Sequence, residues 1–319
     1  MIVLANDGIS PSGENKLKEY GYTVVTETVP QEDLIKYIND NKVAAILVRS
    51  ATTVRKNIID SCPSLKFIGR GGVGMDNIDV EYARSKGLTV NNTPAASSQS
   101  VAELVLAQML SISRFTHLAN KEMPENGDSD FKSLKKKYAK GVELRGKTLG
   151  IIGFGRIGQS LAKYALGCGM KVIAVDRNPI PTIIELEFFN GQKINLEIED
   201  KTLDEVYEQS DYISLHIPKQ ENGSAVISEK EILKMKDGVR IINAARGGVI
   251  DEDAILAAVN SGKISFCALD VFENEPNPRK DLLVNTNITT TPHIGAATLE
   301  AQERIGIELA DKVFECLSK

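Results

Sequence analysis

Short apolar runs alternate with amphipathic stretches through the first part of the chain, from residue 1 to about residue 94. Five of the runs are apolar enough to form strands, and polar stretches with the spacing of surface helices lie between them. The five runs occur in the segments IVLAND, YTVVTE, VAAILVRS, LKFIGRG and LTVNNTP. Strands that alternate with helices predict a parallel sheet covered on both faces.

The same alternation returns at residue 148 and continues to the end of the chain. Its apolar segments are TLGII, KVIAVD, DYISLHIP, VRIINAAR, FCALDVF and ITTTP, with helical patterns between them and a last helix from Leu299. Three acids, Asp251 to Asp253, suit the first turn of one helix, and Asp251 is predicted to cap it. The chain is therefore predicted to be α/β, with two Rossmann-like parallel-sheet domains.

A strand, a glycine turn and a helix follow one another from residue 148, in the segment TLGIIGFGRIG. Gly153 permits the tight turn, Gly155 lets the backbone approach a pyrophosphate, and Gly158 lets the helix pack on the strand. Asp176 ends the next strand, where it can accept hydrogen bonds from an adenosine ribose and repel a 2′-phosphate. The pattern predicts NAD as cofactor. The alternative is a glycine turn that only packs a helix closely.

Two further segments have patterns of their own. Ser97 to about Met123 carries one long helical pattern, which predicts a single helix that crosses between the domains. Residues 183–199 alternate on either side of Asn190-Gly191 and predict a hairpin close to the adenosine end of the nucleotide site. A two-residue loop would separate the two apolar sets, whereas a three-residue loop or a bulge would pair Phe188 with Ile194 and unite them. We predict the second arrangement.

Composition excludes several classes of partner. The formal net charge of the 319 residues is −5, so no basic excess points to nucleic acid or to an anionic membrane surface. The opening MIVLAND lacks the basic flank and long apolar core of a signal peptide, and a cytoplasmic location is expected. The four cysteines are scattered without the spacing of a disulfide framework or a zinc site, so no metal is expected.

Two predicted strand ends in the first domain carry cationic and glycine-rich chemistry. One run ends in Arg49-Ser50, and another ends in Gly69-Arg70-Gly71-Gly72-Val73-Gly74. Carboxyl ends of parallel strands meet at one edge of a sheet, where ligands bind. Guanidinium groups and successive loop amides both suit an anion such as carboxylate or phosphate. The alternative is a pair of surface arginines beside a flexible loop.

A dinucleotide enzyme that moves hydride also needs a group that moves a proton, and histidine is the commonest choice. Of the three histidines, His117 lies on the long helical pattern and His216 precedes Pro218 at a strand end. His293 follows a proline at another strand end and begins a glycine-alanine turn, which makes it the best candidate. Arg246 can grip a substrate carboxylate, and Glu275 can pair with a histidine, favour the imidazolium form and orient the ring.

Five segments, GFGRIG, SLHIP, INAARGGVID, ALDVFENEP and TPHIGAAT, resemble in this order the D-2-hydroxyacid dehydrogenase family across almost the whole chain. Three more, VRSATTV, GRGGVGMDNID and NNTPAASSQSVAEL, resemble the members that oxidise D-3-phosphoglycerate. The resemblance implies NAD-dependent formation of 3-phosphohydroxypyruvate, the first step of phosphorylated serine biosynthesis.

The resemblance also assigns roles to single residues. Arg246 would bind the substrate carboxylate, and Glu275 would support His293 as acid and base. Residues implied at the cofactor are Gly153, Gly155, Arg156, Ile157, Gly158, Asp176, His216, Ile217, Pro218, Ala244, Asp270 and the backbone of Val73. Residues implied at the substrate, with its phosphate on the first two arginines, are Arg49, Arg70, Ser50, Gly72, Gly74 and Arg246.

The family's fold implies the domain boundaries. A discontinuous, flavodoxin-like substrate domain would comprise residues 1–96 and 293–319, with the NAD-binding Rossmann domain, 97–292, inserted into it. The long helix after Pro94 corresponds to the family's crossing and dimer element, so a homodimer that binds a small-molecule substrate is expected. The chain departs from the family in ending at Lys319 without the regulatory domains of longer relatives, in lacking a tryptophan near residues 131–138, and in the 183–199 insert.

Two alternatives stay open at this point. A glyoxylate or hydroxypyruvate reductase of the same family would need no phosphate site. An NAD-sensing binding protein, like the family's transcriptional corepressors, would use the nucleotide for assembly and could keep the catalytic residues.

Overall fold

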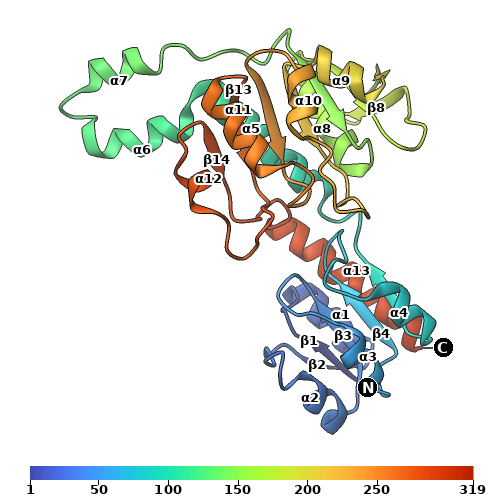
Figure 1. Cartoon of the computed structure of the whole chain (residues 1–319). Coiled ribbons are helices and arrows are strands. Elements are labelled where there is room, and N and C mark those ends of the chain that lie inside the picture. Colours follow the sequence, from blue (N-terminus) through green and yellow to red (C-terminus); the bar gives the residue numbers. More distant parts are fainter. Residues whose placement is uncertain (319) are drawn as a thin grey trace. The chain divides into compact units, whose positions relative to one another are not determined.

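In the computed structural model, which describes residues 1–318, the chain forms two compact units. One comprises Met1–Ser100 with Ala296–Lys319, and the other comprises Val101–Gly295. Each is an α/β unit built on a parallel sheet, so the predicted fold class is confirmed (Figure 1). Residue 319, where the predicted substrate domain ends, lies outside the described residues.

The first unit has a five-stranded sheet in the order β2-β1-β3-β4-β5, and all of its pairings are parallel. Every residue of β3 is buried, because helices cover both faces of the sheet. The strands are β1 (Ile2–Ala5), β2 (Thr23–Val25), β3 (Val43–Val48), β4 (Phe67–Arg70) and β5 (Thr89–Asn92). The helices are α1 (Pro11–Glu19), α2 (Leu34–Asn41), α3 (Lys56–Ser61), α4 (Val80–Ser85) and α13 (Leu299–Leu317).

The C-terminal helix α13 belongs to this first unit, although 195 residues separate the unit's two segments. It packs along α1 and reaches β4 (Figure 1). The two helices cross where Gly13 and Gly306 meet, and a Cβ atom at Gly13 would lie 2.6 Å from the Gly306 backbone. Glycine at both positions allows this close crossing.

The second unit has a seven-stranded parallel sheet in the order β10-β7-β6-β11-β12-β13-β14. Separate clusters of buried apolar side chains include Ile213 and Ile255 in one and Leu161 and Val105 in the other. The strands are β6 (Thr148–Ile152), β7 (Lys171–Val175), β10 (Glu199–Asp200), β11 (Tyr212–Leu215), β12 (Val239–Asn243), β13 (Ile264–Leu269) and β14 (Ile288–Thr290). The helices are α5 (Ser98–Arg114), α6 (Thr116–Asn126), α7 (Phe131–Lys137), α8 (Arg156–Gly167), α9 (Leu203–Gln209), α10 (Glu229–Lys234), α11 (Glu252–Ser261) and α12 (Lys280–Val284). Asp251 caps α11 as predicted, since its side chain accepts the N–H of Ala254.

The predicted single helix from Ser97 to Met123 is wrong, because the structure has two helices there, α5 and α6. The first of them, α5, does pass from the first unit into the second, as predicted, since the boundary lies between Ser100 and Val101. Phe115 separates the two helices with a left-handed backbone, φ 58°. Its ring centroid lies 5.5 Å from that of Phe266 and 6.2 Å from that of Tyr138, so tertiary packing of the ring competes with helix continuation. Local periodicity alone does not reveal such a break.

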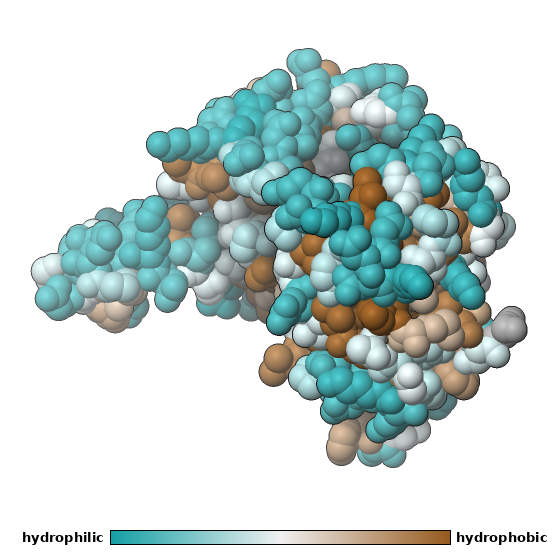
Figure 2. Space-filling view, turned by 90° about the horizontal axis from the view of Figure 1, so that it is seen from below, coloured by the Kyte–Doolittle hydropathy of each residue, from teal (hydrophilic) through white to brown (hydrophobic). Residues whose placement is uncertain are grey.

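Helices α6 and α7 form an arm of the second unit, labelled in Figure 1. An ion pair of 2.6 Å between Lys137 and Glu122 joins the two helices. No residue of α6 is buried, and Figure 2 shows mainly hydrophilic atoms along this arm. The arm therefore contributes little to the core of its own unit.

The predicted hairpin forms from β8 (Ile183–Glu187) and β9 (Lys193–Glu197). Its loop has three residues, 189–191, as predicted, and the apolar sets share one face because Ile184 opposes Leu196. The predicted pairing of Phe188 with Ile194 is wrong: Ile194 opposes Leu186, and Phe188 donates its N–H to the carbonyl of Gln192. A shift of two residues keeps every side chain on the same face, so alternation does not distinguish these registers.

Among the described residues, no helix combines the length and the apolar character that spanning a membrane requires.

The α1–α13 crossing gives a prediction about stability. Gly13→Ala should lower the free energy of unfolding by ~1–3 kcal/mol, because the new methyl group overlaps the Gly306 backbone. Gly167→Ala on α8 is the control, since no atom lies within 4 Å of its added Cβ and alanine favours a helix. Urea unfolding midpoints measure both. Equal midpoints for Gly13→Ala and the parent would contradict a rigid close crossing.

Candidate functional site

Most of the predicted site residues in the second unit follow the carboxyl ends of parallel strands. Six neighbouring strands contribute, and because they are parallel, their carboxyl ends share one edge of the sheet. The residues that follow β6, β7, β11, β12, β13 and β14 are Gly153, Asp176, His216, Ala244, Asp270 and Thr291. The sheet thus gathers positions that lie up to 138 residues apart in the chain, as 153 and 291 do.

The three glycines after β6 differ in what surrounds them. Gly153 has φ 95°, and a Cβ atom there would lie 2.6 Å from the carbonyl oxygen of His216. A Cβ at Gly158 would lie 2.4 Å from the carbonyl oxygen of Gly153. At Gly155, the residue before α8, an added Cβ would meet no protein atom within 4 Å. The turn is closed on the protein side and open where the helix N-terminus would face a pyrophosphate.

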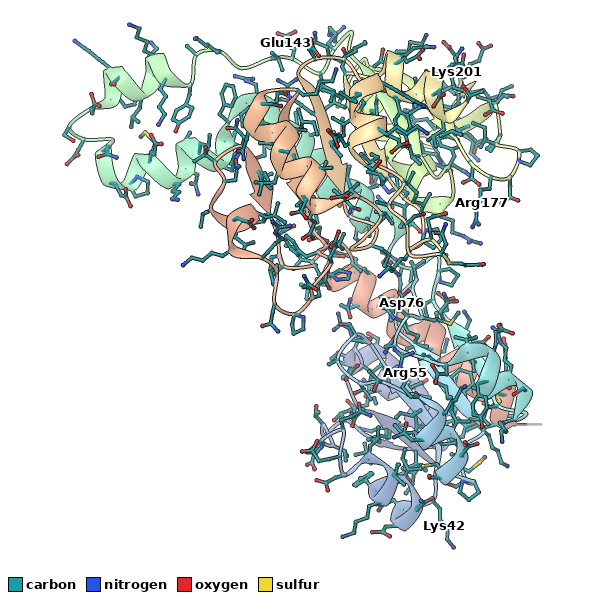
Figure 3. The ribbon with its side chains drawn as sticks, viewed as in Figure 1. Lys42, Arg55, Asp76, Glu143, Arg177 and Lys201 are labelled. Atoms are coloured by element: carbon teal, nitrogen blue, oxygen red, sulfur yellow. The ribbon has the colours of Figure 1, made fainter. Side chains whose placement is uncertain are left out.

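Asp176 is tied to this glycine turn. Its Oδ2 accepts the N–H of Phe154 at 2.8 Å, and its Oδ1 accepts the N–H of Asn178 at 3.0 Å. Arg177, labelled in Figure 3, follows it directly. A carboxylate accepts more than one hydrogen bond per oxygen, so Asp176 retains capacity for ribose hydroxyls. The open turn and this carboxylate together fit the adenosine diphosphate part of NAD.

His216 is held neutral. Burial lowers its pKa to about 3, and its Nε2 lies 2.9 Å from the Ser214 hydroxyl. The carbonyl of His216 abuts Gly153, at the point between β6 and β11 where the strand order reverses. Ligands of such sheets bind at this reversal. His216 therefore suits a wall of the nucleotide site and not proton exchange near neutral pH.

His293 occupies an unusual backbone conformation, with φ 53° in the left-handed region. Its loop is fixed by Asp270, which is 1% exposed and accepts the N–H groups of Ile294 and Gly295, both at 2.9 Å. The hydroxyl of Thr291 donates to the same carboxylate. A non-glycine residue in this region costs on the order of 1–3 kcal/mol, so the three bonds hold a strained loop in place. The predicted contact of Asp270 with the nicotinamide carboxamide stays a prediction.

His293 and Glu275 come together as predicted. Nδ1 of His293 lies 2.8 Å from Oε2 of Glu275, and both side chains are partly exposed. The other oxygen, Oε1, accepts the N–H of Phe272 at 2.9 Å. Burial by itself would raise the pKa of Glu275, but the bonds from His293 and Phe272, with the charges of His293 and Arg246, lower it overall. Glu275 is thus a carboxylate that faces an imidazole.

Arg246 lies in the turn after β12. The buried Asn243 holds this turn, because its amide donates to the Arg246 carbonyl at 3.0 Å and its oxygen accepts the N–H of Ala245. The positive charge of Arg246 contributes to the lowered pKa of Glu275. Gly247 then packs against the Phe272 carbonyl, which a Cβ atom would approach to 1.9 Å. Three predicted catalytic residues therefore share one corner of the second unit.

In the first unit, Arg49 and Asp7 follow β3 and β1, between which the strand order reverses. Asp7 accepts the N–H of Arg49 at 2.6 Å and that of Thr52 at 3.1 Å. Asn77 donates to the carbonyls of the same two residues at 2.9 and 2.6 Å. The loop that carries Arg49 and Ser50 is therefore braced from both sides.

Arg70 lies beside this braced loop. Its Nη1 donates to the Gly71 carbonyl at 3.0 Å and passes over Gly72, where a Cβ atom would lie 1.6 Å away. The N–H of Gly72 donates to the Thr93 hydroxyl at 2.8 Å. Gly71 packs against the Arg49 stem, at 3.5 Å from an added Cβ. Both predicted substrate arginines thus meet at one glycine loop, next to the exposed Val73.

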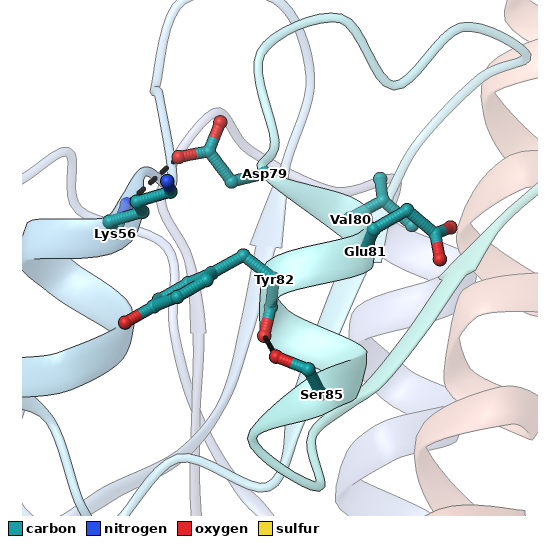
Figure 4. Close-up of a pocket in the computed structure, with 6 residues that line it drawn as sticks. All are labelled: Lys56, Asp79, Val80, Glu81, Tyr82 and Ser85. Carbon is teal, nitrogen blue, oxygen red and sulfur yellow. Dashed lines mark hydrogen bonds between the residues drawn. The ribbon is translucent and has the colours of Figure 1, made fainter.

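A shallow surface pocket lies elsewhere in the first unit, lined by Lys56, Asp79, Val80, Glu81, Tyr82 and Ser85 (Figure 4). Asp79 accepts the N–H of Lys56 at 3.0 Å, and the Lys56 ammonium lies 5.0 Å from the centroid of the Tyr82 ring. These polar groups join α3 to α4. No predicted site residue lines the pocket, and no ligand is assigned to it.

Comparisons with known proteins agree with this geometry. The family model described as "D-isomer specific 2-hydroxyacid dehydrogenase, NAD binding domain" matches residues 106–295. The chain belongs to that family. It is an NAD-dependent D-2-hydroxyacid dehydrogenase, so the fold and the cofactor predicted from its motifs are confirmed.

Relatives of known name differ in substrate. A hydroxypyruvate reductase from Thermotoga maritima is 45% identical over 92% of this chain and 90% of its own length. A D-3-phosphoglycerate dehydrogenase from Methanocaldococcus jannaschii is 40% identical over 99% of this chain, which spans only 57% of that relative. A crystal structure of D-lactate dehydrogenase from Aquifex aeolicus with NAD and lactic acid has TM-score 0.77 and 31% identity, covering 98% of this chain and 94% of its own.

The sequence interpretation missed residues that hold the site without carrying its chemistry. Asn243 and Thr291 stand at strand ends, and a polar residue at the end of an apolar strand is a usable signal. Glu252 was assigned only to a helix N-terminus. No local pattern distinguishes it from Asp253 beside it, although Glu252 is 3% exposed and Asp253 is exposed.

The carboxylate at Asp176 gives a prediction about cofactor choice. Asp176→Ala should weaken NAD binding roughly tenfold to a hundredfold and relax the preference over NADP, because the ribose acceptor and the repulsion of a 2′-phosphate are both lost. Steady-state kinetics with both nucleotides measure the ratio of kcat/KM. Asp237→Ala, an exposed carboxylate at the opposite edge of the sheet, is the control. Equal use of NADP by the parent would remove Asp176 from this role.

Proposed function

We propose that this enzyme oxidises D-3-phosphoglycerate to 3-phosphohydroxypyruvate and catalyses the reverse reduction. The observation that carries the proposal is the pair Arg49 and Arg70 at the Gly71-Gly72 loop of the first unit. Guanidinium groups and loop amides suit a phosphate, and Arg246 supplies a separate cation for a carboxylate. D-3-phosphoglycerate has a phosphate at one end and a carboxylate at the other, so its two anionic groups have the charge that these two cationic positions would bind.

In the proposed mechanism, His293 exchanges the proton of the C2 hydroxyl. Its Nδ1 faces Glu275 at 2.8 Å, which leaves Nε2 as the atom that meets the substrate. Arg246 binds the carboxylate and polarises the adjacent carbonyl. Glu275 orients the ring and stabilises the imidazolium that forms during oxidation. NAD, when bound, supplies the acceptor for the hydride from C2.

Reduction of hydroxypyruvate or glyoxylate is the second candidate. The similarity to the Thermotoga maritima hydroxypyruvate reductase favours it, because that relative matches nearly the full length of both chains. The same triad of Arg246, Glu275 and His293 would serve this reaction without a phosphate site. Assembly as a homodimer and a role in serine biosynthesis belong to the proposal, and the predicted cytoplasmic location stays a prediction.

Substitution of Arg49 separates the two candidates. Arg49→Ala should lower kcat/KM for D-3-phosphoglycerate and 3-phosphohydroxypyruvate roughly tenfold to a hundredfold, since one charge-assisted hydrogen bond is worth ~1.5–3 kcal/mol. Reduction of glyoxylate and hydroxypyruvate should hardly change, because neither carries a phosphate. Arg55→Ala is the matched control (Figure 3), as Arg55 pairs with Asp79 at 3.0 Å.

The outcomes are distinct. If both substrate types lose activity together, Arg49 has a structural or general electrostatic role. A parent enzyme that prefers the unphosphorylated keto acids would replace the first proposal with the second. A protein that binds NAD but turns over none of these substrates would support the corepressor-like alternative.

Glu275→Gln tests the acid and base role. Without the negative charge on Glu275 the imidazolium is less stable, so the midpoint of the pH profile of kcat/KM should move to lower pH. Oxidation, which needs neutral His293, should then become active at a lower pH than in the parent. Reduction, which needs the imidazolium, should be lost as the pH rises, and this loss should occur at a lower pH than in the parent. His293→Ala should abolish turnover. An unchanged profile in Glu275→Gln would remove Glu275 from the pair.

A further inference from the structure

Glu252 is a buried carboxylic acid that the proposed chemistry does not use. It stands in the first turn of α11 and is 3% exposed. Its Oε1 accepts the N–H of Glu273 at 2.8 Å, and its own N–H donates to Oε1 of Glu273 at 3.4 Å. Its other oxygen, Oε2, is buried and makes no hydrogen bond to any described residue.

Burying such an acid is unfavourable for the fold. Burial raises the pKa of Glu252, and the bond from the Glu273 N–H offsets this only in part. Removing a polar group from water is unfavourable unless its hydrogen bonds are replaced, and Oε2 has no replacement within the described residues. An apolar side chain of similar volume would avoid that cost, so the informative feature is the hydrogen bond that the Glu252 carboxylate accepts from the Glu273 N–H.

The bond from the Glu273 N–H attaches Glu252 to the backbone segment that contains Glu275. Two successive backbone N–H groups, those of Phe272 and Glu273, each donate to a carboxylate: the first to Glu275 and the second to Glu252. On its other side the segment contacts Gly247, where a Cβ atom would lie 1.9 Å from the Phe272 carbonyl. The turn is therefore held between α11 and the backbone beside Arg246.

We propose that Glu252 is a positioning residue, which fixes the Phe272–Glu275 turn through the Glu273 N–H and thereby aligns the Glu275 carboxylate with Nδ1 of His293. The inference rests on the proposed acid and base role of His293. Glu252 touches neither the imidazole nor the carboxylate in the described contacts, so it acts through the backbone. A displacement of about 1 Å in a catalytic group can cost up to a hundredfold in rate, which makes such a support consequential.

The same loop has a second attachment to α11, and it provides a matched control. At the far end of the loop Arg279 donates to Asp253, the residue next to Glu252, while Asp253 is 83% exposed. Ion pairs as exposed as this one contribute little to stability. Asp253→Asn therefore removes a carboxylate from the same helical turn as Glu252 and weakens an attachment of the same loop. It leaves the buried bond between Glu252 and the Glu273 N–H unchanged.

The test uses Glu252→Met, which keeps the volume and removes the acceptor, with Glu252→Gln, which keeps an acceptor oxygen. Full pH profiles of kcat and kcat/KM are measured for both with D-3-phosphoglycerate or hydroxypyruvate, whichever the parent turns over faster. Glu252→Met should lower kcat roughly tenfold and move the pH midpoint down, in the direction expected for Glu275→Gln. KM for NAD should stay within about twofold. Glu252→Gln should recover most of kcat and the parental midpoint.

A double-mutant cycle provides the decisive comparison. If Glu252 acts through Glu275, adding Glu252→Met to Glu275→Gln should lower kcat less than twofold further. The Glu275→Gln variant has already lost the carboxylate that Glu252 aligns with His293, so a second change has little left to remove. Additive losses would overturn the proposal, as would a lower unfolding midpoint in Glu252→Met with an unchanged pH profile. If Glu252→Met does not fold, a shifted midpoint in the folded Glu252→Gln overturns it and a parental midpoint supports it.

These results separate the inference from the function that it rests on. A shifted profile in Glu275→Gln with a parental profile in Glu252→Met overturns the positioning role and leaves the acid and base role intact. An unshifted profile in Glu275→Gln overturns both. Asp253→Asn should match the parent, and a loss equal to that of Glu252→Met would mean that any loosening of the loop has the same effect.

Discussion

The parallel register of the seven-stranded sheet is the constraint on which the proposed chemistry depends. In a parallel sheet every strand ends at the same edge, so side chains from distant parts of the chain meet there without any single loop having to span the site. Gly153, Asp176 and His216 line one part of that edge, and the turns after β12, β13 and β14 supply Arg246, Glu275 and His293. Because hydrogen bonds between strands fix the register, those turns begin at fixed positions.

The turns themselves are fixed by buried polar residues and not by the sheet alone. Asn243 closes the Arg246 turn, and Asp270 takes three donors from the loop of His293. A buried carboxylate is costly unless its oxygens are bonded, and here the bonds fall on a loop with a left-handed residue. The three hydrogen bonds therefore offset both the unfavourable backbone and the unfavourable burial, and they give the imidazole a defined direction.

The fold and the contact between His293 and Glu275 could be predicted from sequence because both have local signals. Glycine spacing, strand ends and a proline beside His293 all lie within a few residues of what they indicate. The break at Phe115 and the register of the hairpin could not be predicted in this way. The first depends on packing against Phe266, 151 residues away, and the second depends on a two-residue shift that leaves the apolar pattern unchanged. The hydrogen bond from Glu273 to Glu252 could not be predicted for the same reason, because tertiary packing decides which of the three acids at 251–253 is buried.

Glu252 and Glu275 accept hydrogen bonds from successive N–H groups of one turn, and their surroundings move their pKa values in opposite directions. Glu275 has a lowered pKa, so it adds stability above its unfolded-state pKa, and that contribution is lost as pH falls through its folded-state pKa. Glu252 has a raised pKa, so its cost begins above its unfolded-state pKa and is complete above its folded-state pKa. Near neutral pH the turn therefore keeps a charged Glu275 beside His293 at some expense in stability. Opposed shifts in neighbouring carboxyls are typical of sites that assign different roles to like groups. Here the partly exposed Glu275 would stabilise the imidazolium of His293, and the buried Glu252 would hold the backbone that positions Glu275.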